Sequence, residues 1–199
     1  MKYALLGFTV ATVVWVTSPD RGAPQDQERW SWRGRVAAGR TLEIRGVNGT
    51  ILAERAQGGE IEVLADRHGR RDDPEEVRLE VIEHDGGVTI CAVYPGRRNR
   101  CAPGGGTNSV QNNDVQVDFT VRVPAGVRFE GYTVNGDVEA LNLDGPADVQ
   151  TVNGGITTDF PVQVTGRLTR HRMNGQIGQG GRALRVATVN GAIRLRRIP

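Results

Sequence analysis

One short motif recurs along the second half of the chain and constrains its fold more than any other feature. The tetrapeptide Thr-Val-Asn-Gly occurs at residues 133–136, 151–154 and 188–191. A looser copy, Arg-Met-Asn-Gly, occupies 172–175, and an early copy, Gly-Val-Asn-Gly, occupies 46–49. From residue 135 onward, successive motif asparagines are 18, 21 and 16 residues apart. Self-similarity at such a short period indicates small structural units that stack on one another.

Asn-Gly between apolar residues ordinarily suggests a two-residue β-hairpin turn. Here the flanking apolar residues are four positions apart, as in Val152 and Ile156, with the glycine midway between them. A hairpin would turn these two side chains to opposite faces, whereas a continuous or gently bent strand keeps them on one face. We therefore predict that the chain runs on through each motif, with the glycine facing inward at a corner or at a close backbone approach.

Half-buried strand units of this kind can bury their apolar faces by stacking, as the coils of a β-solenoid do. The sequence therefore predicts an all-β fold, namely a parallel β-helix-like solenoid of short Val-Asn-Gly coils. A twisted β-sandwich is the alternative. The 27 glycines and 5% aromatic residues suit many short strands and tight turns. Stacking would align Asn135, Asn153, Asn174 and Asn190 as a hydrogen-bonded ladder. The structural repeat positions are Asn48, Gly49, Asn135, Gly136, Asn153, Gly154, Asn174, Gly175, Asn190 and Gly191.

The rest of the chain also predicts strands. Alternating or continuous apolar runs lie at 40–53, 61–65, 77–83, 88–94 and 115–123. Residues 101–113 contain three consecutive glycines and predict a polar loop. The expected organisation is a signal peptide or short anchor at 1–23, a linker or N-terminal strand at 24–39, and a single β-repeat domain at 40–199.

The N-terminus has the pattern of an export signal. Met1 and Lys2 precede an apolar run from Ala4 to Val16, and residues 18–26 are polar and proline-containing. Such a run fits a secretory signal and is short for a membrane span, which needs about 20 residues. We expect an exported protein of the periplasm, the outer membrane surface or the extracellular space.

Cys91 and Cys101 are the only two cysteines. In an oxidising compartment they would form a disulfide that closes a small loop and stabilises the fold by about 2–3 kcal/mol. His68, His84 and His171 show no ligand-like spacing to them, so no metal site is predicted.

Charge is distributed unevenly along the chain. The formal net charge is only +2, but residues 161–199 contain eight arginines and no acidic residue. Alternation with apolar neighbours predicts that Arg172, Arg194 and Arg196 face outward, where they are candidate anion-binding residues. Such a concentration of positive charge attracts polyanions. It would equally protect an exposed end of the fold from edge-to-edge association.

Motifs of enzyme chemistry are absent from the sequence. It contains no P-loop, G-x-G-x-x-G, G-x-S-x-G or H-E-x-x-H pattern, and no cofactor is predicted. Asp114 and Asp118 are close in sequence, but an alternating strand usually turns such residues to solvent. We therefore expect no catalytic residues. Export and the scarcity of aromatic residues also argue against a nucleic-acid partner.

Several segments together resemble a known family. The exported N-terminus, the Trp-Ser-Trp at 30–32, the Leu-Glu-Ile to Val-Asn-Gly opening at 42–49 and the segment 119–127 accompany the Val-Asn-Gly-x-Ile repeats. As a set, from about residue 28 to the end, they resemble the DUF4097 group of adhesin-type β-strand-repeat proteins. The resemblance implies a β-solenoid-like domain at the cell envelope, without an established enzymatic activity.

Two classes of function follow. The leading hypothesis is a non-catalytic, adhesin-like binding or scaffolding module. It would contact anionic envelope polymers or lipid through its arginine-rich C-terminal end, or contact another envelope protein. The alternative is a carbohydrate-active enzyme, a lyase or hydrolase, on a β-helix, which would need carboxylates converging on a groove.

Overall fold

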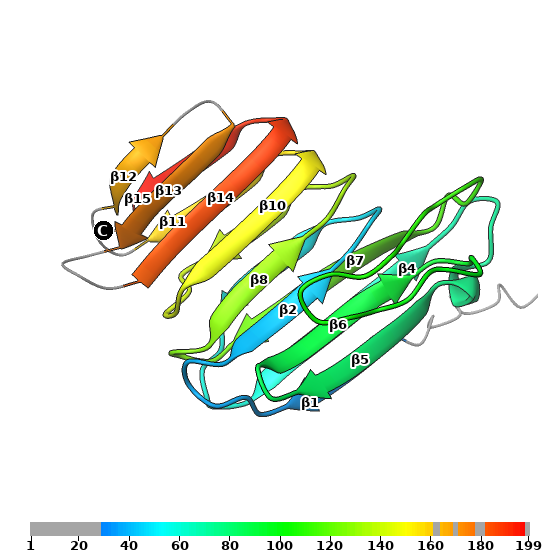
Figure 1. Cartoon of the computed structure of the whole chain (residues 1–199), viewed down its shortest axis with the longest axis horizontal. Helices are drawn as coiled ribbons and strands as arrows, with labels where there is room; N and C mark the ends of the chain where they lie inside the picture. The colour runs from blue at the N-terminus through cyan, green and yellow to red at the C-terminus, as the bar shows by residue number, and fades with distance from the viewer. Residues whose placement is uncertain (1–28, 161–163, 169–170, 178–181, 198–199) are drawn as a thin grey trace, which may run out of the picture.

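The computed structural model describes residues 29–160, 164–168, 171–177 and 182–197, and these form two mixed β-sheets (Figure 1). The seven-stranded sheet has the order β1(Trp30–Gly34), β4(Ile61–His68), β7(Gln116–Val123), β3(Ile51–Arg55), β9(Val138–Leu141), β11(Ile156–Phe160), β15(Ile193–Arg197). The eight-stranded sheet has the order β12(Val164–Leu168), β13(Arg172–Ile177), β14(Arg182–Asn190), β10(Ala147–Asn153), β8(Arg128–Tyr132), β2(Thr41–Arg45), β6(Gly87–Val93), β5(Arg78–His84). A short 3₁₀ helix, η1, spans Pro74–Glu76.

Four strands of the eight-stranded sheet each continue, through an Asn-Gly motif, into a strand of the other sheet. We call the pairs β2–β3, β8–β9, β10–β11 and β14–β15 corner units 1 to 4. Consecutive units pair in parallel in both sheets. Units that are distant in sequence therefore lie side by side, as units 1 and 2 do although β3 ends at Arg55 and β8 begins at Arg128.

Aligning the units on their asparagine explains which side chains form the core. The residue three positions after it is Ile51, Val138 or Ile156 in units 1 to 3, and each is at most 1% exposed. The residue four positions before it is Ile44, Gly131, Val149 or Val186. Each unit thus turns one apolar face toward the space between the sheets, where burial supplies the main stabilising free energy.

The chain turns a corner at the motif of each of the four units, and in units 2 to 4 the prediction that the flanking apolar residues share one face is wrong, whereas Val47 and Ile51 of unit 1 are both buried. Val134 and Val152 are each 38% exposed and Val189 is 61% exposed, whereas Ile156 is fully buried. The threonine before each of these valines is buried instead, at 4% exposure. Strand alternation does not persist through a corner, because the backbone there leaves one sheet and enters the other.

The motif glycines lie at a close backbone approach, which was one of the two predicted reasons for glycine, but they do not face inward. A Cβ on Gly154 would lie 2.1 Å from the carbonyl oxygen of Gly136, and one on Gly136 would lie 2.0 Å from that of Gly49. Each glycine therefore faces the backbone of the preceding unit rather than the core. Only glycine permits the units to approach this closely.

The predicted all-β class is confirmed, and two mixed sheets fit the β-sandwich alternative at least as well as a solenoid. The looser copy at 172–175 does not form a corner. It lies inside β13, which pairs antiparallel with β14, placing Asn174 beside Arg185 and Gly175 beside Leu184. The prediction that this copy stacks with the others is wrong, because β13 folds back on β14 instead of crossing between the sheets.

The structure describes the N-terminal region from residue 29 onward. Residues 1–23, the expected signal peptide or anchor, lie outside the described residues. Within the expected linker or N-terminal strand, residues 30–34 form β1, which pairs antiparallel with β4. Among the described residues, no helix is long and apolar enough to cross a membrane.

Candidate binding surface along the Asn-Gly corners

The motif asparagines of the four corner units form a continuous ladder. The Nδ2 of Asn135 donates to Oδ1 of Asn48 at 2.8 Å, and that of Asn153 donates to Asn135 at 2.8 Å. Asn190 donates in turn to Asn153 at 2.7 Å. Asn135 and Asn153 thus each donate toward unit 1 and accept from the following unit, whereas Asn48 accepts at one end of the ladder and Asn190 donates at the other. The ladder includes Asn48, from the early copy, and excludes Asn174, which was predicted to belong to it.

The threonine of the motif also contributes to stacking, a role that the sequence analysis did not assign. Oγ1 of Thr133 donates to the carbonyl of Gly49 at 3.0 Å, Thr151 donates to Gly136 at 2.8 Å, and Thr188 donates to Gly154 at 2.9 Å. Unit 1 has Gly46 at this position and has no corner unit before it. The sequence did contain a signal for this role, because the early copy has glycine where the three later Thr-Val-Asn-Gly copies have threonine.

The motif valines of units 2 to 4 lie beside the ladder and are the exposed large apolar side chains of the described residues. Neighbouring strands are about 4.8 Å apart, so Val134, Val152 and Val189 form a short aliphatic stripe across corner units 2 to 4. The valine of unit 1, Val47, is only 8% exposed.

A shallow hollow of about 610 Å³ adjoins this stripe on the outer face of the eight-stranded sheet. Val152 and Val189 line it together with Tyr132, His171 and Arg172. Aliphatic side chains and a guanidinium therefore meet at one place on the surface. His171, which directly precedes β13, is also bonded to β14, since its carbonyl accepts from the N–H of Thr188 at 2.9 Å.

The three predicted anion-binding arginines are all exposed, as their alternation with apolar residues predicted. They do not form one surface. Arg172 lies on β13 in the eight-stranded sheet, whereas Arg194 and Arg196 lie on β15 in the seven-stranded sheet. Outward residues of the two sheets point in opposite directions, so the C-terminal charge is divided between two faces.

Acidic residues from earlier strands also offset part of this charge. Arg196 lies 3.6 Å from the carboxylate of Asp159 on β11, and Arg185 lies 3.9 Å from that of Asp148 on β10. Residues 161–199 contain no acidic residue, but parallel pairing brings acidic residues of the preceding unit next to their arginines.

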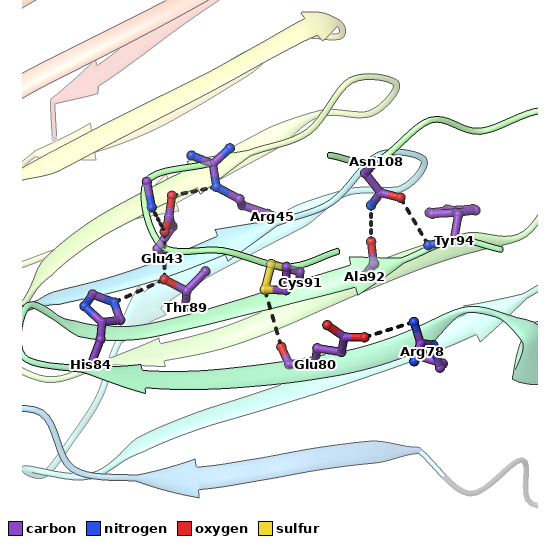
Figure 2. Close-up of a disulfide and its surroundings, with 12 residues drawn as sticks. Glu43, Arg45, Arg78, Glu80, His84, Thr89, Cys91, Ala92, Tyr94 and Asn108 are labelled. Atoms are coloured by element: carbon purple, nitrogen blue, oxygen red, sulfur yellow. Dashed lines mark hydrogen bonds and ion pairs between the residues drawn. A yellow bond between two sulfur atoms is a disulfide. The ribbon is translucent and has the colours of Figure 1, made fainter. Parts of the chain in front are cut away.

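The predicted disulfide between Cys91 and Cys101 is present, and it holds a loop against the outer face of the eight-stranded sheet (Figure 2). The two cysteines pack with Val93 and Ile82 as a small apolar cluster. The same loop covers Glu43, which is 3% exposed.

The buried carboxylate of Glu43 is fully engaged by neighbouring donors. It accepts from Nε of Arg45 at 2.6 Å, Oγ1 of Thr89 at 2.8 Å and the N–H of Gly104 at 2.9 Å. Charge-assisted hydrogen bonds of this kind compensate the cost of burying a carboxylate. Glu43 therefore helps to seat the disulfide loop on the sheet (Figure 2).

An acidic row, missed by the sequence analysis, crosses three strands of this face. Glu43 pairs in register with Glu130, and Glu130 with Asp148. Burial raises the pKa of Glu130, and the charges of Glu43 and Asp148 raise it further. Each of the three residues stands five positions before a motif asparagine, so aligning the repeats on asparagine would have revealed the row.

Asp114 and Asp118, the carboxylates noted in the sequence, hold loops and strands together. Oδ1 of Asp118 accepts from both the N–H and Oγ1 of Thr50, and Oδ2 lies 2.7 Å from Nε2 of His68. Burial alone would raise the pKa of Asp118, but these hydrogen bonds lower it overall. Asp114 accepts from the N–H groups of Arg71 and Asp72.

Comparison with known proteins gives two distant structural likenesses. A candidate cell adhesion protein of Clostridium sporogenes matches with 11% identity and a TM-score of 0.43, covering 86% of this chain and 100% of that one. A candidate adhesin of Parabacteroides distasonis matches with 12% identity and a TM-score of 0.27, covering 68% of this chain and 58% of that one. With overlap this partial, neither structure assigns a function to the chain. No protein-family model and no curated protein matches the sequence.

Proposed function

We propose that the protein is an exported, non-catalytic, adhesin-like binding module of the cell envelope that contacts an anionic lipid surface along its Asn-Gly corners. The observation that carries the proposal is the hollow where exposed Val152 and Val189 meet Arg172. Exposed aliphatic groups beside a cation match the chemistry of a membrane interface. A hydrophilic polyanion would use the arginine but gain nothing from the valines.

The free energy available from each group sets the expected strength of this contact. Burial of apolar surface contributes roughly 25 cal/mol per Å², so three partly exposed valines supply a modest share. Each arginine near an anionic membrane surface adds about 1 kcal/mol, and salt screens this contribution. The single hollow therefore supports weak, reversible and salt-sensitive binding.

Export and family are part of the same proposal. The N-terminal apolar run and the Cys91–Cys101 disulfide support an oxidising compartment, either the periplasm, the outer membrane surface or the extracellular space. The Val-Asn-Gly repeats support membership of the DUF4097 group. The ladder and the parallel pairing of the four corner units support their description as coils of a short β-solenoid.

Carbohydrate-active chemistry has weaker support from the geometry. The carboxylates of Glu43, Glu130 and Asp148 lie side by side on one face of a single sheet, and the disulfide loop covers Glu43. Glu43 is occupied by structural donors, and Asp148 accepts from Gln150 at 3.0 Å. A glycosidase needs its two carboxyl groups on opposite sides of a scissile bond.

Vesicle binding tests the proposal. The protein should sediment with phosphatidylglycerol vesicles at low salt, with less binding to phosphatidylcholine vesicles and less at high salt. Val152→Ser with Val189→Ser, and separately Arg172→Gln, should each weaken binding. Arg98→Gln, at an exposed position in the disulfide loop, is the matched control and should not.

Three results would refute this proposal. They are equal binding to the two vesicle types, binding that survives both sets of substitutions, and binding lost through Arg194→Gln with Arg196→Gln while Arg172→Gln has no effect. If the protein bound a soluble polyanion, and the valine substitutions did not weaken that binding, the ligand would be an anionic polymer instead of a lipid surface.

A further inference from the structure

The ladder of corner units ends differently on its two sides. Beside unit 1, β7 pairs with β3 and β6 pairs with β2, so both of its strands are covered. Beside unit 4, β13 covers β14, but β15 is the last strand of the seven-stranded sheet. Among the residues that the structure describes, half of unit 4 is therefore covered and half is an open edge.

The hydrogen-bond pattern shows which backbone groups this edge presents. In units 1 to 3, the residue three positions after the asparagine donates its N–H toward the next unit. Ile51 donates to Asp137, Val138 to Gly155, and Ile156 to Ala192. The motif glycines do the same, as when Gly154 donates to the carbonyl of Asn190. By the same register, the N–H groups of Gly191, Ile193 and Leu195 point away from β11 toward the open edge.

Packing at the edge is also incomplete. Ile156 and Thr158, on β11, are fully buried. Ile193 and Leu195, at the equivalent positions of β15, pack against the core but are only half-buried. Another strand alongside β15 would cover these side chains as well as the backbone, as each earlier unit is covered by its successor.

A second copy of the chain is a poor occupant of this edge. Antiparallel self-pairing across a two-fold axis centred on Arg194, Leu195 or Arg196 would place arginine opposite arginine on the outer face. Like charges directly opposite one another on paired strands are destabilising. The arginines thus prevent self-association, which is a common role of charge on edge strands.

An acidic strand suits the same positions. Asp159 on β11 is the register partner of Arg196, with their charged atoms 3.6 Å apart. Glu139 on β9 and Thr157 on β11 share the row of Arg194. The neighbours of β15 within its own sheet therefore place acids in the rows that its arginines occupy.

We propose that β15 is a docking edge for a strand of another protein, added in parallel, that alternates inward apolar residues with outward acidic residues. Strand addition of this type takes its affinity from main-chain hydrogen bonds and its specificity from alternate side chains. An Asn-Gly corner in the partner would continue the ladder, since Oδ1 of Asn190 accepts no bond from any described residue. This surface is distinct from the valine hollow and goes beyond the proposed lipid contact.

A peptide of the chain's own sequence provides the probe. Residues 133–141 already stack in parallel within the fold, with Val138 inward and Glu139 outward. A fluorescent copy of this peptide should bind the full-length protein in the absence of lipid, as measured by anisotropy. Arg194→Glu should weaken binding up to about fivefold, the range of one cross-strand charge pair. A peptide that carries Glu139→Arg should bind the Arg194→Glu protein with the original affinity.

Leu195→Pro tests the backbone contribution. Proline removes an N–H that only the open edge uses, and edge positions tolerate proline. This variant should keep a cooperative thermal transition, with a midpoint lowered only by the lost packing of the half-buried side chain, and lose peptide binding by more than tenfold. Leu195→Val, which retains the N–H, should bind.

Failure of this proposal is distinguishable from failure of the proposed lipid contact, because lipid is absent from the assay. No binding of either peptide, full binding by the Leu195→Pro protein, or no recovery with the charge-reversed pair would overturn it. So would a concentration-dependent dimer that Leu195→Pro abolishes, because the edge would then accept a second copy.

Discussion

Corner units 1 and 4 contain the same motif in opposite surroundings. In unit 1, Val47 is 8% exposed, and the carbonyl of Asn48 accepts from the N–H of Val117 at 2.8 Å. In unit 4, Val189 is 61% exposed, and its asparagine is the last of the ladder. Nothing in the motif itself limits how many units can stack. Segments outside it decide where the stack ends, and they close one end more completely than the other.

The closed end depends on the disulfide-containing half of the chain. Tyr94, which follows β6, is 1% exposed, and its hydroxyl donates to the carbonyl of Val115 at 2.7 Å and of Asn48 at 3.4 Å. Burial raises the pKa of Tyr94 to about 12. The less regular N-terminal region thus supplies the cap that the repeats lack.

The largest expected effect comes from the interior of the stack, where units approach most closely. Gly154→Val should lower the free energy of unfolding by about 3 kcal/mol, because its Cβ would overlap the backbone of Gly136. Gly155→Ala is the matched control, since the nearest atom to its Cβ is at 3.5 Å. Urea denaturation measures both. An unchanged midpoint for Gly154→Val would show that the units are not stacked this tightly.

Equivalent valines at the two ends sharpen the comparison further. Val47→Ser should lower the free energy of unfolding by about 2 kcal/mol, because it exchanges buried apolar surface for a hydroxyl. Val189→Ser should change it by less than about 0.5 kcal/mol, as is usual for exposed positions. Thermal denaturation of the two variants side by side gives the difference. Equal losses would mean that the C-terminal end is covered.

Alanine substitutions in the asparagine ladder should also destabilise the interior of the stack more than its C-terminal end, with smaller losses of stability. Asn153→Ala removes two side-chain hydrogen bonds, one donated and one accepted, whereas Asn190→Ala removes one. At about 0.5–1.5 kcal/mol each, and toward the lower figure for exposed amides, the interior variant should lose roughly twice as much stability. Chemical denaturation of both variants tests this ratio. A larger loss for Asn190→Ala would argue against an open end.

Much of this architecture could be predicted from local patterns. Alternation indicated most strands, two cysteines in an export context indicated the disulfide, and the recurrence of Asn-Gly indicated stacking. The chain's direction through the motif could not be predicted, because alternation is informative only while the backbone stays in one sheet. The looser copy at 172–175 matched the motif in letters, but without the buried threonine it lacks the bond to a preceding unit.

The candidate surface was harder to foresee, since its groups come from separate units. Exposure of Arg172, Arg194 and Arg196 followed from alternation, but their division between two faces depends on which sheet each strand joins. The offset of Arg196 by Asp159 and the row of Glu43, Glu130 and Asp148 depend on register between strands. Register became readable only when the repeats were aligned on their asparagines.

Amide hydrogen exchange at the two ends of the stack tests the central claim most directly. Gly49 and Ile51 donate to Asn135 and Asp137 of unit 2, whereas Gly191 and Ile193 face the open edge. Residue-resolved NMR exchange should show strong protection at Gly49 and Ile51 and near-random-coil exchange at Gly191 and Ile193. Addition of the 133–141 peptide should slow exchange at Gly191 and Ile193. Equal protection at the two ends in the free protein would contradict the account.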